Sequence, residues 1–444
     1  MERQILELKR YLSPDELANF KTDYGILAAK AKALYDKRPQ KGPSFQTAFN
    51  MAAYLHAINA PRELIWAALG QGLMGGYTRE LTEKYLSYLA VKEQRHDQLR
   101  LRDETSQIMG IYSDLVQSPV AETNQRAIAT AHINPHNLSA SLLRSVHLLF
   151  TLHENWDKDE RYAQLSRNWY APFTYALGHR RLSRDLQDKI FELSEPEDYS
   201  KVHEVLVAHE NAITSSDDFK SFRRRLSREL LTSGLREGKD YYVEQRPKSV
   251  ASTATKMHDE KLDFDDVSDL YGMRIILLSD KLASGQIDHE KTVKRCYLVK
   301  SALERVVKKM RGVRGNVPHE PIDYIRNPKP PQDPFHLLSG SSKVSGYQGI
   351  NFPLVHDKLK VALPDGGEMP AHIEVQIMGD FHQKNNEFGW GSRLGYKHDI
   401  SDEAKILLDA IGRAKSLSQP IEKAISDAVR LVDYAQHKGG KKRK

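Results

Sequence analysis

The spacing of apolar residues changes character near Gly238. Before this point, long segments carry apolar residues at three- and four-residue intervals, which is the pattern of helices with one buried face. After it, short segments that predict strands are separated by helical ones. The chain therefore predicts an all-α first part followed by a separate domain with a mixed sheet, an α+β multidomain fold.

Helix signals are clearest in the first half of the chain. Ser13 stands before Pro14, and Glu16 follows within the first turn, which predicts a helix start with a Ser N-cap and a capping box. Glycine and proline then punctuate the pattern. Further helices are expected over Arg62–Gly75, Arg79–Gln94, Leu138–Glu154, Trp169–Leu193 and Asp218–Ser233.

Beyond Gly238 the expected elements are shorter. A loop rich in Pro, Gly and Ser is expected over Arg326–Ser342, and helix returns over Ser401–His437. Strands are expected over Tyr241–Gln245, Arg274–Leu278, Phe352–Val361 and His372–Ile377, with helices over Val250–Lys256 and Thr292–Met310. The expected domains are 1–200 (helical), 201–238 (helical linker), 239–398 (mixed sheet), 399–436 (C-terminal helices) and 437–444 (basic tail).

Charge and cysteine content narrow the class of protein. The formal net charge of +7 suits a partner that is a polyanion, such as a nucleotide or RNA, although it also serves solubility. Part of the excess lies in the tail 437–444, a possible RNA contact. The single cysteine, Cys296, excludes an intrachain disulfide and a Cys-based zinc site. The absence of a signal peptide and of any long apolar stretch predicts a cytoplasmic protein with no membrane contact.

A basic turn opens the mixed-sheet domain. Arg246 and Lys248 flank Pro247, which fixes the backbone so that both cations project from a rigid turn. Ser252 can add a hydroxyl donor and Lys256 a further cation, so the segment can grip phosphate groups. A solvated basic turn is the alternative interpretation, because such turns are common on protein surfaces.

Two acids stand on strand-like segments. Asp269 precedes an apolar strand, and acids at strand ends often bind Mg²⁺, although Asp265 and Asp266 are equally acidic and a helix cap is the alternative. Glu374 alternates with apolar residues and shares a strand face with Gln376. A glutamate in the middle of a strand suits a metal ligand or a proton acceptor, and an exposed edge strand is the alternative.

Taken in order, seven short motifs resemble the synthetase domain of the RelA/SpoT family, which has a nucleotidyltransferase-like fold. That family transfers pyrophosphate from ATP to the 3′-hydroxyl of GDP or GTP and so makes the alarmone (p)ppGpp. The resemblance implies Mg²⁺ as cofactor and ATP with GDP or GTP as partners. The motifs are RPKS (246–249), DLYGMRI (269–275), CY (296–297), DYI (323–325), GYQ (346–348), EVQI (374–377) and EFG…YK (387–397).

The resemblance also implies roles for single residues. Asp269 matches the family's Mg²⁺ ligand, and Glu374 matches a second acid that binds metal and acts as general base. Tyr347 matches the ring that stacks on guanine, and Lys343 falls where a lysine contacts the acceptor's phosphates. The other expected nucleotide-binding residues are Arg246, Lys248, Ser252, Lys256, Arg274 and Gln376.

Upstream, residues 169–199 resemble the segment that joins the family's hydrolase and synthetase domains. Residues 40–155 are then expected to be an HD-type hydrolase domain that lacks its chemistry. Gln71 and Gly72 stand where the family has His and Asp, and a later metal-binding Asp falls near His147. Gln and Gly offer no anionic oxygen, so we expect a pseudo-hydrolase domain without activity.

Other departures lie on the acceptor side. Ser345, Gly349 and Asn351 replace Asn, Ser and His of the family's motif, and residues 330–342 are inserted before it. Glu320 begins a partial match to the acidic element of synthesis-only members. We therefore expect a synthesis-only enzyme without a C-terminal regulatory region. The alternatives are a toxin-type relative that modifies tRNA 3′ ends or adenosine nucleotides, and a non-enzymatic nucleotide-sensing regulator.

Overall fold

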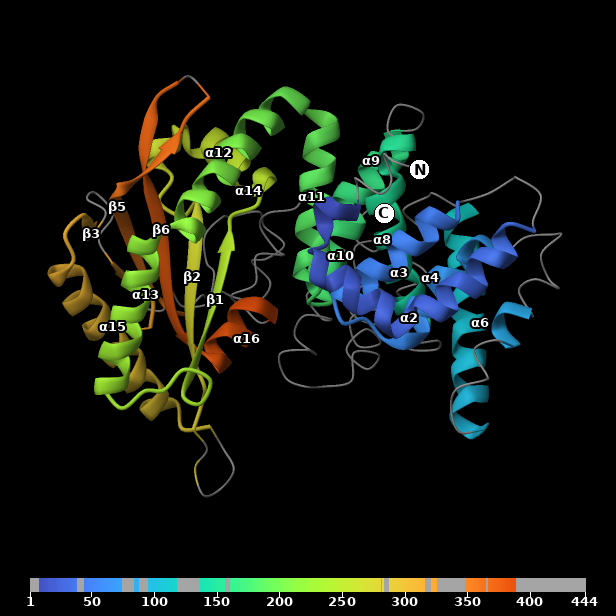
Figure 1. Cartoon of the computed structure of the whole chain (residues 1–444), viewed down its shortest axis with the longest axis horizontal. Helices are drawn as coiled ribbons and strands as arrows, with labels where there is room; N and C mark the ends of the chain where they lie inside the picture. The colour runs from blue at the N-terminus through green and yellow to red at the C-terminus, as the bar shows by residue number, and fades with distance from the viewer. Residues whose placement is uncertain are drawn as a thin grey trace, which may run out of the picture. The chain divides into compact units, whose positions relative to one another are not determined.

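The computed structural model describes residues 8–37, 44–73, 84–87, 95–117, 136–155, 160–280, 282, 287–315, 321–325, 348–364 and 366–388. The chain forms two compact units (Figure 1). One comprises Met1–Leu193 with His398–Lys444, and the other comprises Ser194–Lys397. None of the helices in the described ranges combines the length and the apolar content that a membrane crossing requires.

The first unit is helical throughout its described residues, as the apolar spacing predicts. The predicted helix over Leu138–Glu154 is confirmed, whereas most of Arg79–Gln94 lies outside the described residues. Its elements are α2 (Pro14–Tyr35), α3 (Phe45–Ala57), α4 (Arg62–Gly70), the 3₁₀ turn η1 (Gln71–Leu73), α6 (Arg95–Gln117), α8 (His136–Asn155), α9 (Glu160–Leu165), the π-helical turn η2 (Ser166–Tyr170), α10 (Ala171–Ala176) and α11 (Arg180–Ser194).

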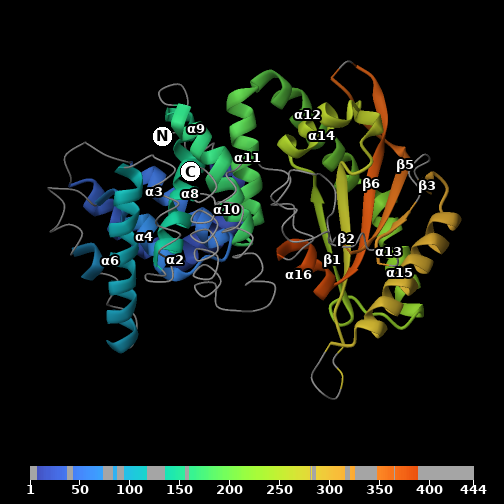
Figure 2. The ribbon, with the colours of Figure 1, turned by 180° about the vertical axis from the view of Figure 1, so that it is seen from behind.

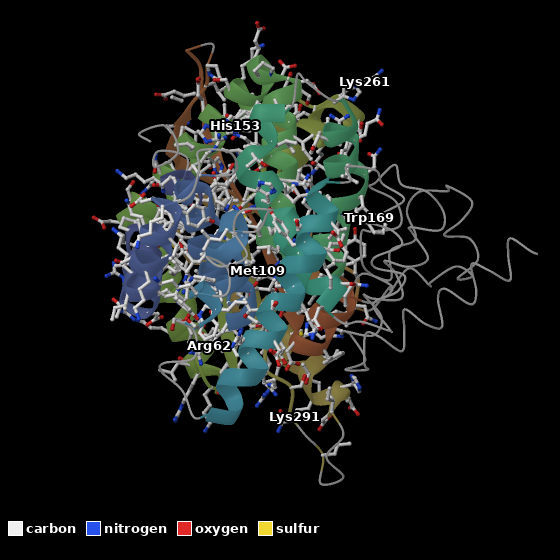
Figure 3. The ribbon with its side chains drawn as sticks, turned by 90° about the vertical axis from the view of Figure 1, so that its right-hand side faces the viewer. Arg62, Met109, His153, Trp169, Lys261 and Lys291 are labelled. Carbon is white, nitrogen blue, oxygen red and sulfur yellow. The ribbon has the colours of Figure 1, made fainter. Side chains whose placement is uncertain are left out.

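The start of α2 has the predicted capping box. The Ser13 hydroxyl accepts the N–H of Glu16, and the Glu16 carboxylate accepts the N–H of Ser13. Two backbone donors that the helix itself leaves unpaired are thus satisfied. Buried side chains of several of these helices form the core of this unit; Met109 marks α6 and Trp169 marks η2 in Figure 3.

The expected single helix over Trp169–Leu193 is wrong. The chain passes from η2 into α10, stops at Leu177 and restarts as α11. Gly178 lies in the left-handed region with φ of 83° and donates its N–H to the carbonyl of Tyr175. A residue without Cβ takes this conformation readily, so the glycine ends one helix and redirects the chain into the next.

The second unit combines helices with one mixed sheet, and the strands and helices expected between Tyr241 and Ile377 are confirmed. Its helices are α12 (Pro196–Ser215), α13 (Asp217–Thr232), α14 (Val250–Glu260), η3 (Phe264–Asp266), α15 (His289–Lys309) and α16 (Asp380–Phe388). Its strands are β1 (Tyr241–Pro247), β2 (Tyr271–Leu277), β3 (Val313–Gly315), β4 (Ile322–Asp323), β5 (Ile350–Ala362) and β6 (Glu368–Gly379).

The strand order is β1-β2-β6-β5-β3, and β4 pairs with β5. β2 and β6 are parallel, whereas the other pairs are antiparallel. One face of the sheet is apolar: Met273 and Ile275 alternate with Gly272 and Arg274 along β2, and β6 alternates in the same way. The burial of every second residue fixes which side chains face the opposite, polar side.

Helices lie against both faces. α13 and α15 pack together beside the apolar face, where Leu226 and Leu230 of α13 approach Met273 (Figure 1). α14 and α16 lie near opposite ends of β1 and β2 (Figure 2). α12 contacts α14, β5 and β6, and Nε2 of its buried His209 accepts the N–H of His372. Residues 201–238, expected to form a linker, thus contribute two helices that pack within this unit.

Candidate active site

The polar face of the sheet carries two cross-strand rows of side chains. Directly opposite residues of neighbouring strands point to the same side of a sheet, so the register alone brings these residues together. One row contains Glu244, Arg274, Gln376 and Asn351. The other contains Arg246, Gly272, Glu374 and Pro353. Because Gly272 has no side chain, the second row is open between Arg246 and Glu374.

Asp269 precedes β2, and two lysines converge on it. Lys248 Nζ lies 2.5 Å from Asp269 Oδ2, and Lys256 Nζ of α14 lies 3.0 Å from Oδ1. The N–H of Lys248 also donates to the carbonyl of Leu270, which ties the end of β1 to the residue after Asp269. The three charged side chains are at most 24% exposed. Two cations and one anion therefore form a compact, mostly buried group.

The charge of Asp269 is set by these lysines. Burial alone raises the pKa of its carboxyl group, because the charged form loses its hydration. The charges of Lys248 and Lys256, with their hydrogen bonds, outweigh burial and hold the pKa of Asp269 well below its ordinary value. Asp269 is thus an anion at neutral pH.

Glu374 lies near the middle of β6 and is held by two amide side chains. Asn351 Nδ2 donates to Glu374 Oε1 at 3.2 Å, and Gln376 Nε2 donates to Oε2 at 2.5 Å. Arg274 Nε donates to Gln376 Oε1 at 2.8 Å. A guanidinium only donates and a carboxylate only accepts, so the amide of Gln376 can bridge them in one orientation alone. The network fixes the position of the Glu374 carboxylate.

The pKa of Glu374 is shifted in the opposite direction to that of Asp269. Burial raises the pKa, and the negative charge of Asp269 raises it further; the hydrogen bond from Gln376 and the charges of Lys248 and Lys256 oppose this. The net result is a pKa above the ordinary value for Glu. Asp269 and Glu374 are therefore coupled carboxylates, and the neutral form of Glu374 is favoured first by its burial and then by the charge of Asp269.

The N-terminus of α14 adds to the positive charge near Lys248 and Lys256. Ser249 is its N-cap, and the Ser249 hydroxyl accepts the N–H of Ser252. The hydroxyl group of Ser252, which is half-buried, lies in the first turn of this helix. Arg246 lies next to the last residue of β1, opposite Gly272. The helix N-terminus adds a partial positive charge beside two lysines, a combination that favours phosphate oxygens.

Two further sets of hydrogen bonds near the site were not expected from the sequence. Asn386 of α16 binds the backbone of Gln348 twice: Oδ1 accepts its N–H at 2.8 Å, and Nδ2 donates to its carbonyl at 2.7 Å. The Tyr297 hydroxyl donates to the carboxylate of Asp323 at 3.0 Å. These contacts hold the last residue of the GYQ motif and the first residue of the DYI motif. Tyr297 and Asp323 could have been found from the sequence, because they lie in the CY and DYI motifs. No motif pointed to Asn386.

Most of the expected site residues lie together in this unit. Asp269, Lys248 and Lys256 form the ion group, and Glu374, Gln376 and Arg274 form the hydrogen-bonded network beside it. Asn351, which the sequence presented only as a departure from a motif, contacts Glu374 directly. Lys343 and Tyr347 lie outside the described residues, as do the predicted loop 326–342 and the predicted helix 401–437.

The segment that carries this site is similar to known proteins. A family model for the region found in RelA / SpoT proteins matches residues 245–401, which include Asp269 and Glu374. A probable chloroplastic GTP diphosphokinase of Arabidopsis thaliana is 25% identical over 273 residues, covering 61% of this chain and 40% of that protein. The GTP pyrophosphokinase of Photobacterium angustum is 28% identical over 235 residues, covering 53% of this chain and 25% of that protein.

The GTP pyrophosphokinase of Escherichia coli is 27% identical over 242 residues, covering 54% of this chain and 26% of that protein. The chain thus spans less than half the length of the curated relatives it matches. Among solved structures, small alarmone synthetase 1 of Bacillus subtilis bound to its product pppGpp aligns with a TM-score of 0.29 at 16% identity. That alignment covers 54% of this chain and 96% of that one.

Proposed function

We propose that this chain, whose residues 245–401 match the model of the region found in RelA / SpoT proteins, is an ATP-dependent pyrophosphokinase that makes (p)ppGpp from GDP or GTP. The observation that carries the proposal is the pairing of two electrostatically coupled carboxylates, Asp269 and Glu374, with the lysines that converge on Asp269. Transfer of a phosphoryl group between nucleotides depends chiefly on positioning and charge neutralisation, and these residues supply both.

The donor set fits a divalent cation, taken here as Mg²⁺. Mg²⁺ is usually bound by one or two carboxylates together with substrate phosphates, and Asp269 and Glu374 would be two such ligands. The pKa of Glu374 is raised first by burial and then by the charge of Asp269, and a bound cation would favour the ionised carboxylate. When bound, the metal would neutralise charge on the phosphates of ATP.

The protein's own groups account for the remaining chemistry. The 3′-hydroxyl oxygen of the acceptor attacks the β-phosphorus of ATP, the bond from that phosphorus to the α–β bridging oxygen breaks, and AMP leaves. Glu374 accepts the proton of the hydroxyl group, a role that suits a carboxylate whose pKa is raised toward neutrality. Lys248 and Lys256 turn from Asp269 toward the phosphates and stabilise the charge that develops on the transferred group.

ATP and the acceptor nucleotide are proposed to be recognised by different residues of the site. Arg246 and Ser252 are proposed to contact the phosphates of ATP, with Arg274 and Gln376 orienting Glu374 beneath them. Lys343 and Tyr347 are proposed to contact the phosphates and base of the acceptor. The first part of the chain is proposed to be an inactive hydrolase-like domain, so that the enzyme acts in synthesis only.

The reaction itself is the direct test. Purified protein is incubated with γ-³²P-ATP, Mg²⁺ and, separately, GDP, GTP, AMP, ATP and bulk tRNA, and the products are resolved by thin-layer chromatography. Label on GDP or GTP is expected. Label on tRNA or on adenosine nucleotides would instead favour a toxin-type relative, and label on no acceptor would contradict an enzymatic function.

The pH dependence of the reaction is expected to report Glu374. Only the ionised carboxylate can accept a proton, so kcat should fall as the pH is lowered through the raised pKa of Glu374. Asn351→Leu removes a donor that favours the charged form, so its acidic limb should lie at higher pH than in the wild type. The measurement is kcat against pH for both proteins.

The matched control is Asn211→Leu, because Asn211 is exposed on α12. This variant should reproduce the wild-type profile. An unchanged acidic limb in Asn351→Leu would contradict the assignment of Glu374 as the proton acceptor.

A further inference from the structure

The helical unit contains a buried arginine without a carboxylate partner. Arg144 of α8 is 1% exposed, and no carboxylate among the described residues forms an ion pair with it. In contrast, each ion pair between an arginine and an acid that is described for this unit is partly exposed to solvent, such as the pair of Arg181 and Glu16. A buried cation is costly unless an anion and hydrogen-bond acceptors compensate it. Arg144 therefore requires an explanation other than packing.

The immediate neighbours of Arg144 do not neutralise it. One terminal nitrogen, Nη1, lies 2.7 Å from His147 Nδ1, and the guanidinium lies 5.6 Å from the centre of the Tyr162 ring. The guanidinium also hydrogen-bonds with the buried hydroxyl group of Tyr170, which stays neutral because burial raises its pKa. Burial and then the charge of Arg144 hold the pKa of His147 well below its ordinary value, so this imidazole is neutral. Its Nδ1 accepts from the guanidinium, and the positive charge remains uncompensated.

Three hydrogen-bond donors in this cluster lack acceptors. Arg144 Nε and Nη2 are buried without a partner, and so is Gln71 Nε2 at the end of α4. Tyr112 of α6 connects them: its hydroxyl donates to Gln71 Oε1 at 3.2 Å, its ring packs edge-on against His147, and the charge of Arg144 acts on it. The unsatisfied atoms are all donors, and the only formal charge is positive.

We propose that Arg144, Gln71 and His147 form a binding site for an oxyanion, the phosphate group of a small molecule. A tetrahedral oxyanion has the acceptors and the negative charge that this cluster lacks. The Nε–Nη2 edge of a guanidinium pairs with two oxygens at once, and the Gln71 amide supplies a third donor. The unpartnered atoms of this cluster are donors and its formal charge is positive, so it favours an anion over a metal ion.

The site is tested on the full chain carrying Lys256→Met, which weakens the phosphate grip proposed in the other unit. Isothermal titration calorimetry with inorganic phosphate, pyrophosphate and GDP is expected to show saturable binding of at least one of them. Gln71→Met keeps the volume but removes a donor, and should weaken this binding about tenfold, as expected for one hydrogen bond to a charged group. Arg144→Lys removes the two-oxygen contact and should weaken it further.

The matched control is Arg181→Lys in the same background. Arg181 is already paired with Glu16, so this variant should bind as the background protein does. Only the part of the binding that Gln71→Met weakens reports on this site, because GDP is also the proposed acceptor in the other unit. If that part is tighter for pyrophosphate or phosphate than for GDP, the ligand is a free anion, and the reverse identifies a nucleotide phosphate.

The proposal is overturned if none of the three ligands binds, or if Gln71→Met binds them as tightly as the background protein. Gln71→Met alone decides the outcome if Arg144→Lys fails to fold. The result is independent of pyrophosphokinase activity, since no turnover is measured.

Discussion

Glu374→Gln is expected to lower kcat about 10³-fold, within the range that a general base contributes. Glutamine has the same shape but can neither accept the proton nor offer a second anionic oxygen to a cation. The raised pKa of Glu374 means that the folded protein favours the neutral form of this side chain more than the unfolded chain does. At neutral pH the ionised carboxylate therefore costs stability, and the glutamine variant should have an equal or higher Tm.

The combined measurement is kcat and Tm on the same protein, with Glu368→Gln as the control. Glu368 begins the same strand and is exposed, so its variant should keep wild-type kcat within about threefold. Loss of activity together with a falling Tm would mean that Glu374 is a structural residue. A kcat near the wild-type value would remove it from the mechanism.

The helical and strand pattern was predictable wherever the period of apolar residues was regular. The alternation of HIEVQI predicts Glu374 and Gln376 on one face of a strand, and β6 has this arrangement. The continuous helix expected over Trp169–Leu193 failed for a local reason. Apolar residues recur on both sides of Gly178, so periodicity continues through a point at which the backbone turns.

The choice among neighbouring acids could not be made from the sequence. Asp265, Asp266 and Asp269 have the same chemistry, and they differ in what the rest of the chain brings to them. Asp266 accepts the N–H of Asp263 in η3, whereas Asp269 receives lysines from the end of β1 and from α14. The hydrogen bond from Asn351 to Glu374 depends likewise on the register between β5 and β6, which a single sequence does not specify.

Asp269→Asn is expected to lower kcat/KM for Mg-ATP roughly 100- to 1,000-fold, because an anionic metal ligand becomes neutral. Its effect on stability should be opposite to that of Glu374→Gln. The depressed pKa of Asp269 means that its charge stabilises the fold above the ordinary Asp pKa of 3.8, and that this contribution is lost as the pH falls below that value. At neutral pH the variant leaves Lys248 and Lys256 without their partner and should lose about 2 kcal/mol of unfolding free energy.

Chemical denaturation at pH 7 and near pH 3, with Mg²⁺ titrations of activity, separates these effects. The difference in stability between wild type and Asp269→Asn should shrink at the lower pH, because the wild-type carboxyl begins to lose the advantage of its charge. Asp265→Asn is the control, since Asp265 is exposed four residues away and its variant should match the wild type. A constant stability difference at both pH values would show that the lysines do not hold Asp269 as an anion. Unchanged Mg²⁺ dependence would place the metal elsewhere, because a neutral amide at this position cannot replace a carboxylate ligand.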